Sequence, residues 1–167
     1  MDFSRLNPAR VVIGGLASSL LLLSLLFMPW YSLGNTGFRH PGSANFHVAW
    51  VCGTNDFSCT GFETFPILRW LLILAALAPA ILAYILVRRH RLSWPPGEMT
   101  MVAGFAAAIL IIYNGIIDTP GSGIAEQSVS LDYGYWIALV SALVIAGTGF
   151  TRSQEGQRKV RKAPGTV

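Results

Sequence analysis

An apolar run from Val11 to Trp30 that contains no charged residue constrains this chain more than any other feature. As a helix, a run of this length extends about 30 Å, which matches the hydrocarbon layer of a bilayer. Arg5 and Arg10 precede it as in a secretory signal, but the run exceeds a signal's usual apolar segment and no small-x-small cleavage site follows. We therefore predict a first transmembrane helix that is retained as an anchor.

Three further apolar blocks follow, and each is long enough to cross a membrane. Pro79 lies within the second block and predicts a kink, because proline removes a helical hydrogen bond. Glu98 precedes the third block, where a helix N-terminus favours negative charge. We expect an all-α membrane protein in which residues 1–150 form a single bundle of four transmembrane helices, with spans at about 11–30, 66–87, 99–117 and 133–150.

Composition supports lipid as the surrounding solvent. Hydrophobic residues make up 53% of the chain and charged residues only 12%, whereas a soluble domain is about 25% charged. The formal net charge is +4, but the basic residues lie at the ends of the apolar blocks and in the C-terminal segment. We therefore expect anionic lipid headgroups of the inner leaflet as partners, and no nucleic acid.

The distribution of Lys and Arg predicts the orientation. With both termini on one side, only Arg39 and Arg69 of the 12 basic residues fall on the opposite side. The positive-inside rule then places both termini in the cytoplasm of a multi-pass protein. We expect residues 151–167 to form a basic, disordered tail. The residues expected to contact the inner leaflet are Arg88, Arg89, Arg91, Arg158, Lys159, Arg161 and Lys162.

The first outer loop, residues 31–65, contains the only two cysteines, Cys52 and Cys59. Disulfides persist outside the cytoplasm, so we predict that a bridge between them pins this loop. Alternation over residues 45–51 leaves short strands open for the same loop. A redox-active pair and a zinc site formed with His40 and His47 are weaker alternatives, because neither spacing matches a known pattern.

Arg69 is the one basic residue inside a predicted span, close to its outer boundary. Its long side chain can reach the headgroups, which is the interpretation we favour. The alternative is an outer polar cluster that could shape a binding cleft. Its candidate members are Glu63, Arg69, Asn114, Asp118 and Asp132.

Small residues four positions apart predict close helix packing within the spans. They favour a compact bundle over a pore and leave a homo-oligomer open. The pairs are Gly14 with Ser18, Gly104 with Ala108, and Ala138 with Ala142.

Two groups of short motifs carry resemblances. Trp30, Trp50, Cys52 and Cys59 in a first outer loop resemble the signature of claudin-like junction proteins, as a likeness of topology alone. The chain more closely resembles small four-span proteins of unassigned function from actinobacteria, which implies a bacterial plasma membrane. The motifs behind this second resemblance are Phe27-Met28-Pro29-Trp30-Tyr31, Gly61-Phe62-Glu63-Thr64-Phe65-Pro66, Leu92-Ser93-Trp94-Pro95, Tyr113-Asn114-Gly115-Ile116-Ile117-Asp118-Thr119-Pro120-Gly121 and Lys162-Ala163-Pro164-Gly165.

The sequence contains no familiar catalytic motif, so we expect no catalytic residue, no cofactor and no metal. The predicted function is a non-enzymatic accessory or scaffold subunit that contacts another envelope component through its outer loop. A small oligomeric transporter or channel is the alternative, although no span contains a deep carboxylate. A thiol-disulfide oxidoreductase ranks third, because a second cysteine pair is missing.

Overall fold

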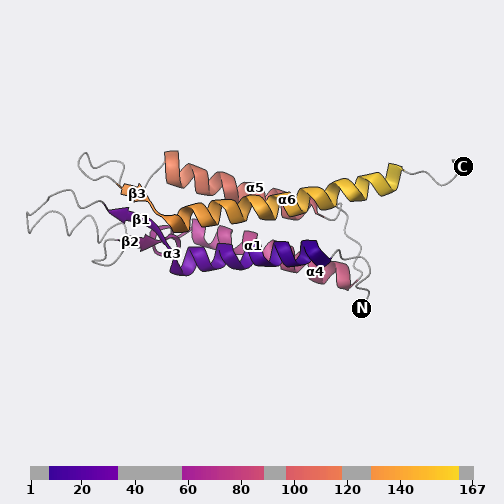
Figure 1. Ribbon diagram of the computed structural model, residues 1–167, viewed down its shortest axis with the longest axis horizontal. Coiled ribbons are helices and arrows are strands. Elements are labelled where there is room, and N and C mark those ends of the chain that lie inside the picture. Colours follow the sequence, from indigo (N-terminus) through magenta and orange to yellow (C-terminus); the bar gives the residue numbers. More distant parts are fainter. Residues whose placement is uncertain (1–7, 34–57, 89–96, 118–128, 162–167) are drawn as a thin grey trace, which may run out of the picture.

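The computed structural model describes residues 8–33, 58–88, 97–117 and 129–161. Figure 1 shows the long helices lying along one another, with a small sheet at one end of the bundle and the N- and C-terminal ends of the chain toward the other. In chain order the elements are α1 (Pro8–Phe27), β1 (Pro29–Leu33), β2 (Ser58–Thr60), α3 (Gly61–Thr64), α4 (Leu68–Val87), α5 (Glu98–Ile112), the π-helical turn η2 (Tyr113–Ile117), β3 (Val129–Leu131) and α6 (Tyr133–Arg161).

Three of these helical segments are long and apolar enough to cross a membrane: Leu68–Ile85, Glu98–Ile117 and Tyr133–Gln154. The apolar part of α1, Val11–Phe27, is shorter. A predominantly helical fold of long apolar helices is therefore confirmed.

The first apolar block ends earlier than predicted. The helix stops at Phe27, and Pro29 and Trp30 belong to strand β1. Proline cannot donate the next helical hydrogen bond, and it disfavours helical backbone at the residue before it.

The last helix is longer than predicted. Helix α6 continues to Arg161, so residues 151–161 are helical where we expected a disordered tail. Gln, Glu, Arg and Lys are good helix formers, and they extend a helix that the packed bundle has already nucleated. Residues 162–167 lie outside the described part of the chain.

Helices α5 and α6 pack through small residues, as the sequence predicted for two of the three pairs. Ala108, Ala138 and Ala142 are fully or almost fully buried. A Cβ placed on Gly104 would lie only 2.4 Å from the backbone nitrogen of Ala146. Only glycine permits so close an approach of the two backbones.

Large apolar side chains cover much of the outside of the bundle, while alanine is frequent inside it. The interior contains Ala76, Ala107, Ala138, Ala142 and Ala146 together with a few leucines and isoleucines. The exposed surface of the helices includes Leu16, Leu20, Leu74, Ile81, Ile109 and Val140. A continuous apolar exterior of this kind is unusual for a protein surrounded by water.

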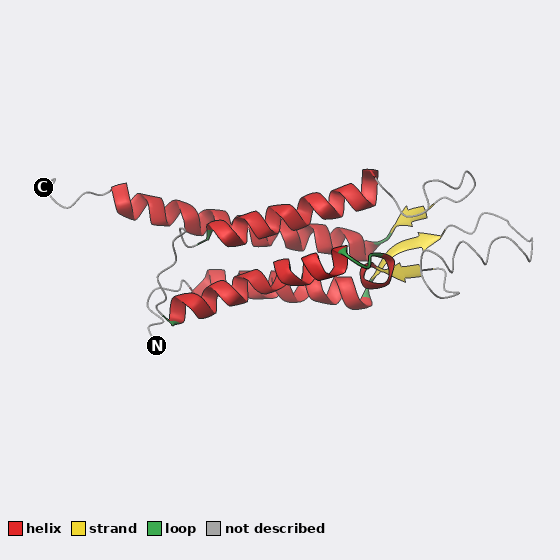
Figure 2. Cartoon of the chain, turned by 180° about the vertical axis from the view of Figure 1, so that it is seen from behind, coloured by secondary structure: helices red, strands yellow, loops and turns green. Residues whose placement is uncertain are grey.

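A three-stranded antiparallel sheet closes one end of the bundle, beside the single turn of α3 (Figure 2). Strand β1 lies between β2 and β3, with Tyr31 opposite both Cys59 and Leu131. Strands β1 and β2 flank the long loop, and β3 follows the second loop. The strand expected over residues 45–51 lies outside the described residues.

Candidate functional site

The sheet is joined to the helices by four aromatic side chains, Trp30, Tyr31, Phe65 and Tyr135, which we call the aromatic cluster. Trp30 and Tyr31 follow each other on β1 and are 0% and 1% exposed. The Trp30 ring meets Phe65 and Tyr135 edge to face, with centroids 6.5 and 6.0 Å apart. Tyr31 meets Phe65 in the same way at 5.9 Å. These contacts fix the central strand on the bundle.

Each polar atom of the aromatic cluster has a hydrogen-bond partner on another element. The Trp30 Nε1 donates to the carbonyl and the hydroxyl of Ser24, both at 3.1 Å. The Ser24 hydroxyl donates to the Gly134 carbonyl at the start of α6. Tyr31 donates to the carbonyl of Asn114 and Tyr135 to that of Ile111, each at 3.2 Å. Around the aromatic cluster, these hydrogen bonds connect five elements: α1, β1, α5, η2 and α6.

The π-helical turn η2 lies directly against the aromatic cluster. A Cβ on Gly115 would lie 2.1 Å from the Tyr135 ring, so the ring occupies the space that a side chain would need. The Asn114 amide donates to the Leu110 carbonyl at 2.8 Å, within its own helix. Turns of this type often occur at functional positions in helices.

Burial raises the pKa of the Tyr31 hydroxyl well above its usual range, and the nearby Tyr135 adds to the effect. Tyr31 therefore remains a neutral hydrogen-bond donor at physiological pH. It acts as a structural donor to Asn114 and cannot readily form a phenolate.

Glu63, a candidate member of the predicted polar cluster, belongs to a capping box. Its carboxylate accepts from the backbone nitrogen and the hydroxyl of Thr60 at 3.1 and 3.0 Å, and its own nitrogen donates to that hydroxyl at 3.3 Å. This arrangement starts helix α3. The Thr-x-x-Glu pattern is the sequence signal that could have identified the helix.

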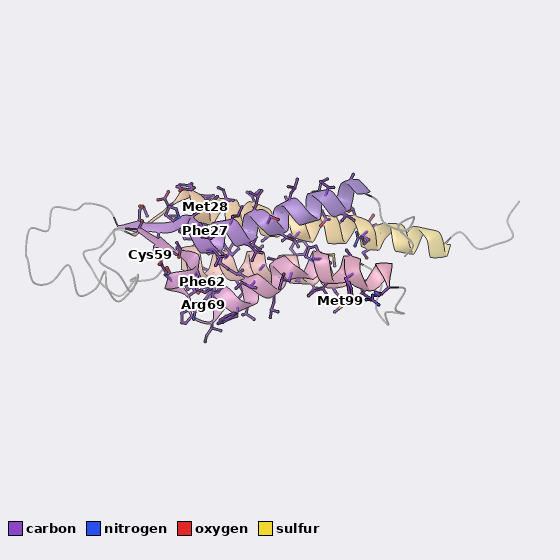
Figure 3. All side chains as sticks on the ribbon, turned by 90° about the horizontal axis from the view of Figure 1, so that it is seen from below. Phe27, Met28, Cys59, Phe62, Arg69 and Met99 are labelled. Carbon is purple, nitrogen blue, oxygen red and sulfur yellow. The ribbon has the colours of Figure 1, made fainter. Side chains whose placement is uncertain are left out.

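Arg69 is held by aromatic rings. Its guanidinium lies 4.7 Å from the centroid of Phe62 and 5.6 Å from that of Trp70. One terminal nitrogen donates to the Phe62 carbonyl at 3.4 Å, and Nε has no partner within the described ranges. Figure 3 places Arg69 and Phe62 at the sheet end of the molecule.

The described polar partners proposed for Arg69 are each hydrogen-bonded within their own local structure. Asp132 accepts from the backbone nitrogen of Tyr133 at 2.7 Å, where it begins helix α6. Its own nitrogen donates to the Trp30 carbonyl at 2.9 Å. Together with the bonds of Glu63 and Asn114, this leaves Arg69 without an ion pair among the described residues. Asp118 lies outside them.

Cys59 lies in the middle of β2 and is 1% exposed. Its expected partner Cys52, and His40 and His47 of the alternative zinc site, lie outside the described residues. Within the described ranges, no group of three or more His, Cys, Asp or Glu could hold a metal. The disulfide stays a prediction.

Several predicted headgroup contacts lie at the end of the bundle remote from the sheet. Arg88 is exposed, with its guanidinium 5.3 Å from the Tyr84 ring centroid. Arg158, Lys159 and Arg161 fall on the last turns of α6. Arg89, Arg91 and Lys162 lie outside the described residues.

No protein-family model, curated protein or solved structure matches this chain. The resemblances to small four-span actinobacterial proteins and to claudin-like proteins therefore stay predictions.

Proposed function

We propose that this chain is a four-span membrane protein that serves as a non-enzymatic scaffold and presents two outer loops to another component of the cell envelope. One observation carries the proposal. Strand β1 pairs with β2 on one side and β3 on the other, so stems of both loops belong to one sheet. The aromatic cluster in turn fixes that sheet to the bundle.

The apolar exterior supports placement in a membrane. Large side chains such as Leu16, Leu74 and Ile109 point outward along the helices, where lipid would solvate them and water would not. Helix α1 has 20 residues, which is enough for the first of four spans. The positive-inside rule favours the sheet end as the outer end, because basic residues gather at the opposite end.

Rigid loop stems suit a binding role. A loop whose ends are already fixed loses less conformational entropy when it binds a partner than a loop with free ends. The proposed bridge from buried Cys59 to Cys52 would shorten the free part of the first loop further. The groups fixed around the sheet are hydrogen-bonded structural groups, which fits a scaffold better than an enzyme.

Site-specific photo-crosslinking in native membranes tests this role. A crosslinking residue at exposed Ser58 or Ser130 lies on the sheet, while the same residue at exposed Gln154 lies at the other end and serves as the matched control. We expect a discrete heterologous adduct from the two sheet positions and none from Gln154. Recovery of the protein alone from both sheet positions would contradict the proposal.

A further inference from the structure

A cavity of about 500 Å³ lies in the half of the bundle remote from the sheet, between α1, α4 and α6. Its volume falls within the range of small-molecule sites, about 300–1,000 Å³. Most of its wall is apolar, and it is lined by Pro79 and Ala80 of α4 and by Gly15 and Ser18 of α1. Thr100 of α5 and Arg152 of α6 complete the wall.

The cavity exists because small residues on α1 do not bring the neighbouring helices into close contact. A Cβ on Gly14 would lie 3.7 Å from the Cβ of Pro79 and 3.8 Å from the Thr148 hydroxyl, which are ordinary contact distances. Gly15 is exposed, and a Cβ placed on it would meet no described atom within 4 Å, so the cavity is open to the outside of the bundle at this residue. The Gly14 and Ser18 pair, predicted as a packing surface, thus borders a space.

Two hydroxyls in the wall have no hydrogen-bond partner in the described part of the chain. Ser18 and Thr100 are 9% and 3% exposed, and their side-chain oxygens are buried and unbonded. Two other hydroxyls that line the cavity are satisfied: Ser19 donates to the Gly15 carbonyl at 2.9 Å and Thr148 to the Ile145 carbonyl at 2.8 Å. Unbonded buried hydroxyls are rare in proteins, and each calls for a bound partner or another physical cause.

We propose that this cavity binds one anionic membrane lipid. One acyl chain of the lipid fills the apolar space. Acceptor oxygens of the lipid bind the hydroxyls of Ser18 and Thr100, and its phosphate lies near Arg152. Water alone would bond the hydroxyls but would leave the apolar wall wet. An amphiphile combines an apolar chain, acceptor oxygens and a negative charge, which match the apolar wall, the two hydroxyls and the charge of Arg152. This inference rests on the proposed membrane placement, with Arg152 toward the inner leaflet.

Native mass spectrometry of the full-length protein in detergent tests the proposal, with phosphatidylglycerol and phosphatidylcholine of identical chains as probes. We expect one phosphatidylglycerol per chain, bound at least 10-fold more tightly than phosphatidylcholine. Gly15→Leu places a side chain into the open space and should weaken phosphatidylglycerol binding at least 10-fold. Gly147→Leu is the matched control, because a Cβ there also meets nothing within 4 Å and Gly147 does not line the cavity.

Two further variants separate the parts of the site. Ala80→Leu fills the cavity from α4 and should weaken binding like Gly15→Leu, which keeps the test valid if one variant misfolds. Arg152→Gln should reduce the preference for phosphatidylglycerol over phosphatidylcholine to less than threefold. Thermal unfolding without lipid shows whether each variant is folded.

Several outcomes would overturn the proposal. Equal binding by wild type and both filled variants would place the lipid elsewhere. Equal affinity for the two lipids would show that the site does not recognise an anionic headgroup. Equally tight binding of glycerol phosphate alone would show that the ligand is a free anion and not a lipid. A dimer that dissociates on filling the cavity would assign the space to a second copy. Because these measurements use the isolated protein, they can fail while the crosslinking of the sheet end succeeds, and the reverse.

Discussion

The indole nitrogen of Trp30 and the hydroxyl of Ser24 lie 3.1 Å apart in the buried junction between the sheet and the helices. The same hydroxyl donates to the Gly134 carbonyl, so one serine near the end of α1 connects the central strand to the start of α6. Of the serines in the apolar helix α1, Ser24 is the one that bonds to both the strand and α6.

Ser24→Ala should destabilise the protein by about 1–3 kcal/mol, because the Gly134 carbonyl loses its donor in a buried place. Thermal unfolding in detergent measures the change. Thr151→Ala is the control, since its exposed hydroxyl only bonds to the Thr148 carbonyl within α6. Equal stability of the two variants would show that the Ser24 bonds contribute little.

Gly115→Ala should cost about 1–3 kcal/mol, because the added methyl group overlaps the Tyr135 ring and overpacking forces the ring or η2 to move. Gly147→Ala should be neutral or stabilising by up to about 1 kcal/mol, because alanine is the better helix former and nothing crowds the site. Chemical denaturation of both variants tests the difference. Indistinguishable effects would mean that η2 does not pack tightly on Tyr135.

Glu63→Ala and Arg69→Ala should act independently. The first removes the capping box of α3, at a cost of about 0.5–2 kcal/mol, and the second removes contacts with Phe62 and Trp70. A double-mutant cycle measured by unfolding should therefore give an interaction energy below about 0.5 kcal/mol. A larger interaction energy would indicate that Glu63 and Arg69 form an ion pair after all.

Alkaline pH should weaken the fold through Tyr31. Its folded pKa is raised above the ordinary tyrosine value of 10.0, so its contribution to stability is complete below that value. As pH rises above 10.0, the unfolded chain loses this proton first and the contribution declines by up to about 1.4 kcal/mol per pH unit. Tyr31→Phe lacks this proton and should lose less stability between pH 9 and 11 than wild type. Parallel curves for the two proteins would contradict the assignment.

Much of the helical architecture could be predicted from the sequence, because apolar length and charge placement are local properties. The run from Val11 and the blocks over 66–87, 99–117 and 133–150 each correspond to an apolar helix, with changed ends. The early end of α1 could also have been predicted, because Pro29 is a local signal for the end of a helix. The helical extension of α6 to Arg161 depends on a helix already formed upstream.

The sheet and the cavity could not be predicted because both depend on contacts between distant residues. Strand β3 is three residues long and pairs with Tyr31 about a hundred positions earlier. Such a strand has no periodicity of its own to detect. Likewise, Gly14 with Ser18 and Gly104 with Ala108 have the same spacing, but a Cβ on Gly104 would overlap the backbone of Ala146, whereas one on Gly14 would only reach ordinary contact distances.

Thiol labelling in intact cells tests the central claim most directly, because that claim is a membrane bundle whose sheet faces outward. Ser130→Cys and Gln154→Cys place exposed thiols at opposite ends of the molecule, and a membrane-impermeant maleimide reports which side each end faces. The unsubstituted protein gives the background of the native cysteines. We expect labelling above this background at position 130 in intact cells, and at position 154 only after permeabilisation. Labelling of position 154 in intact cells, or protection of position 130 there, would contradict the account.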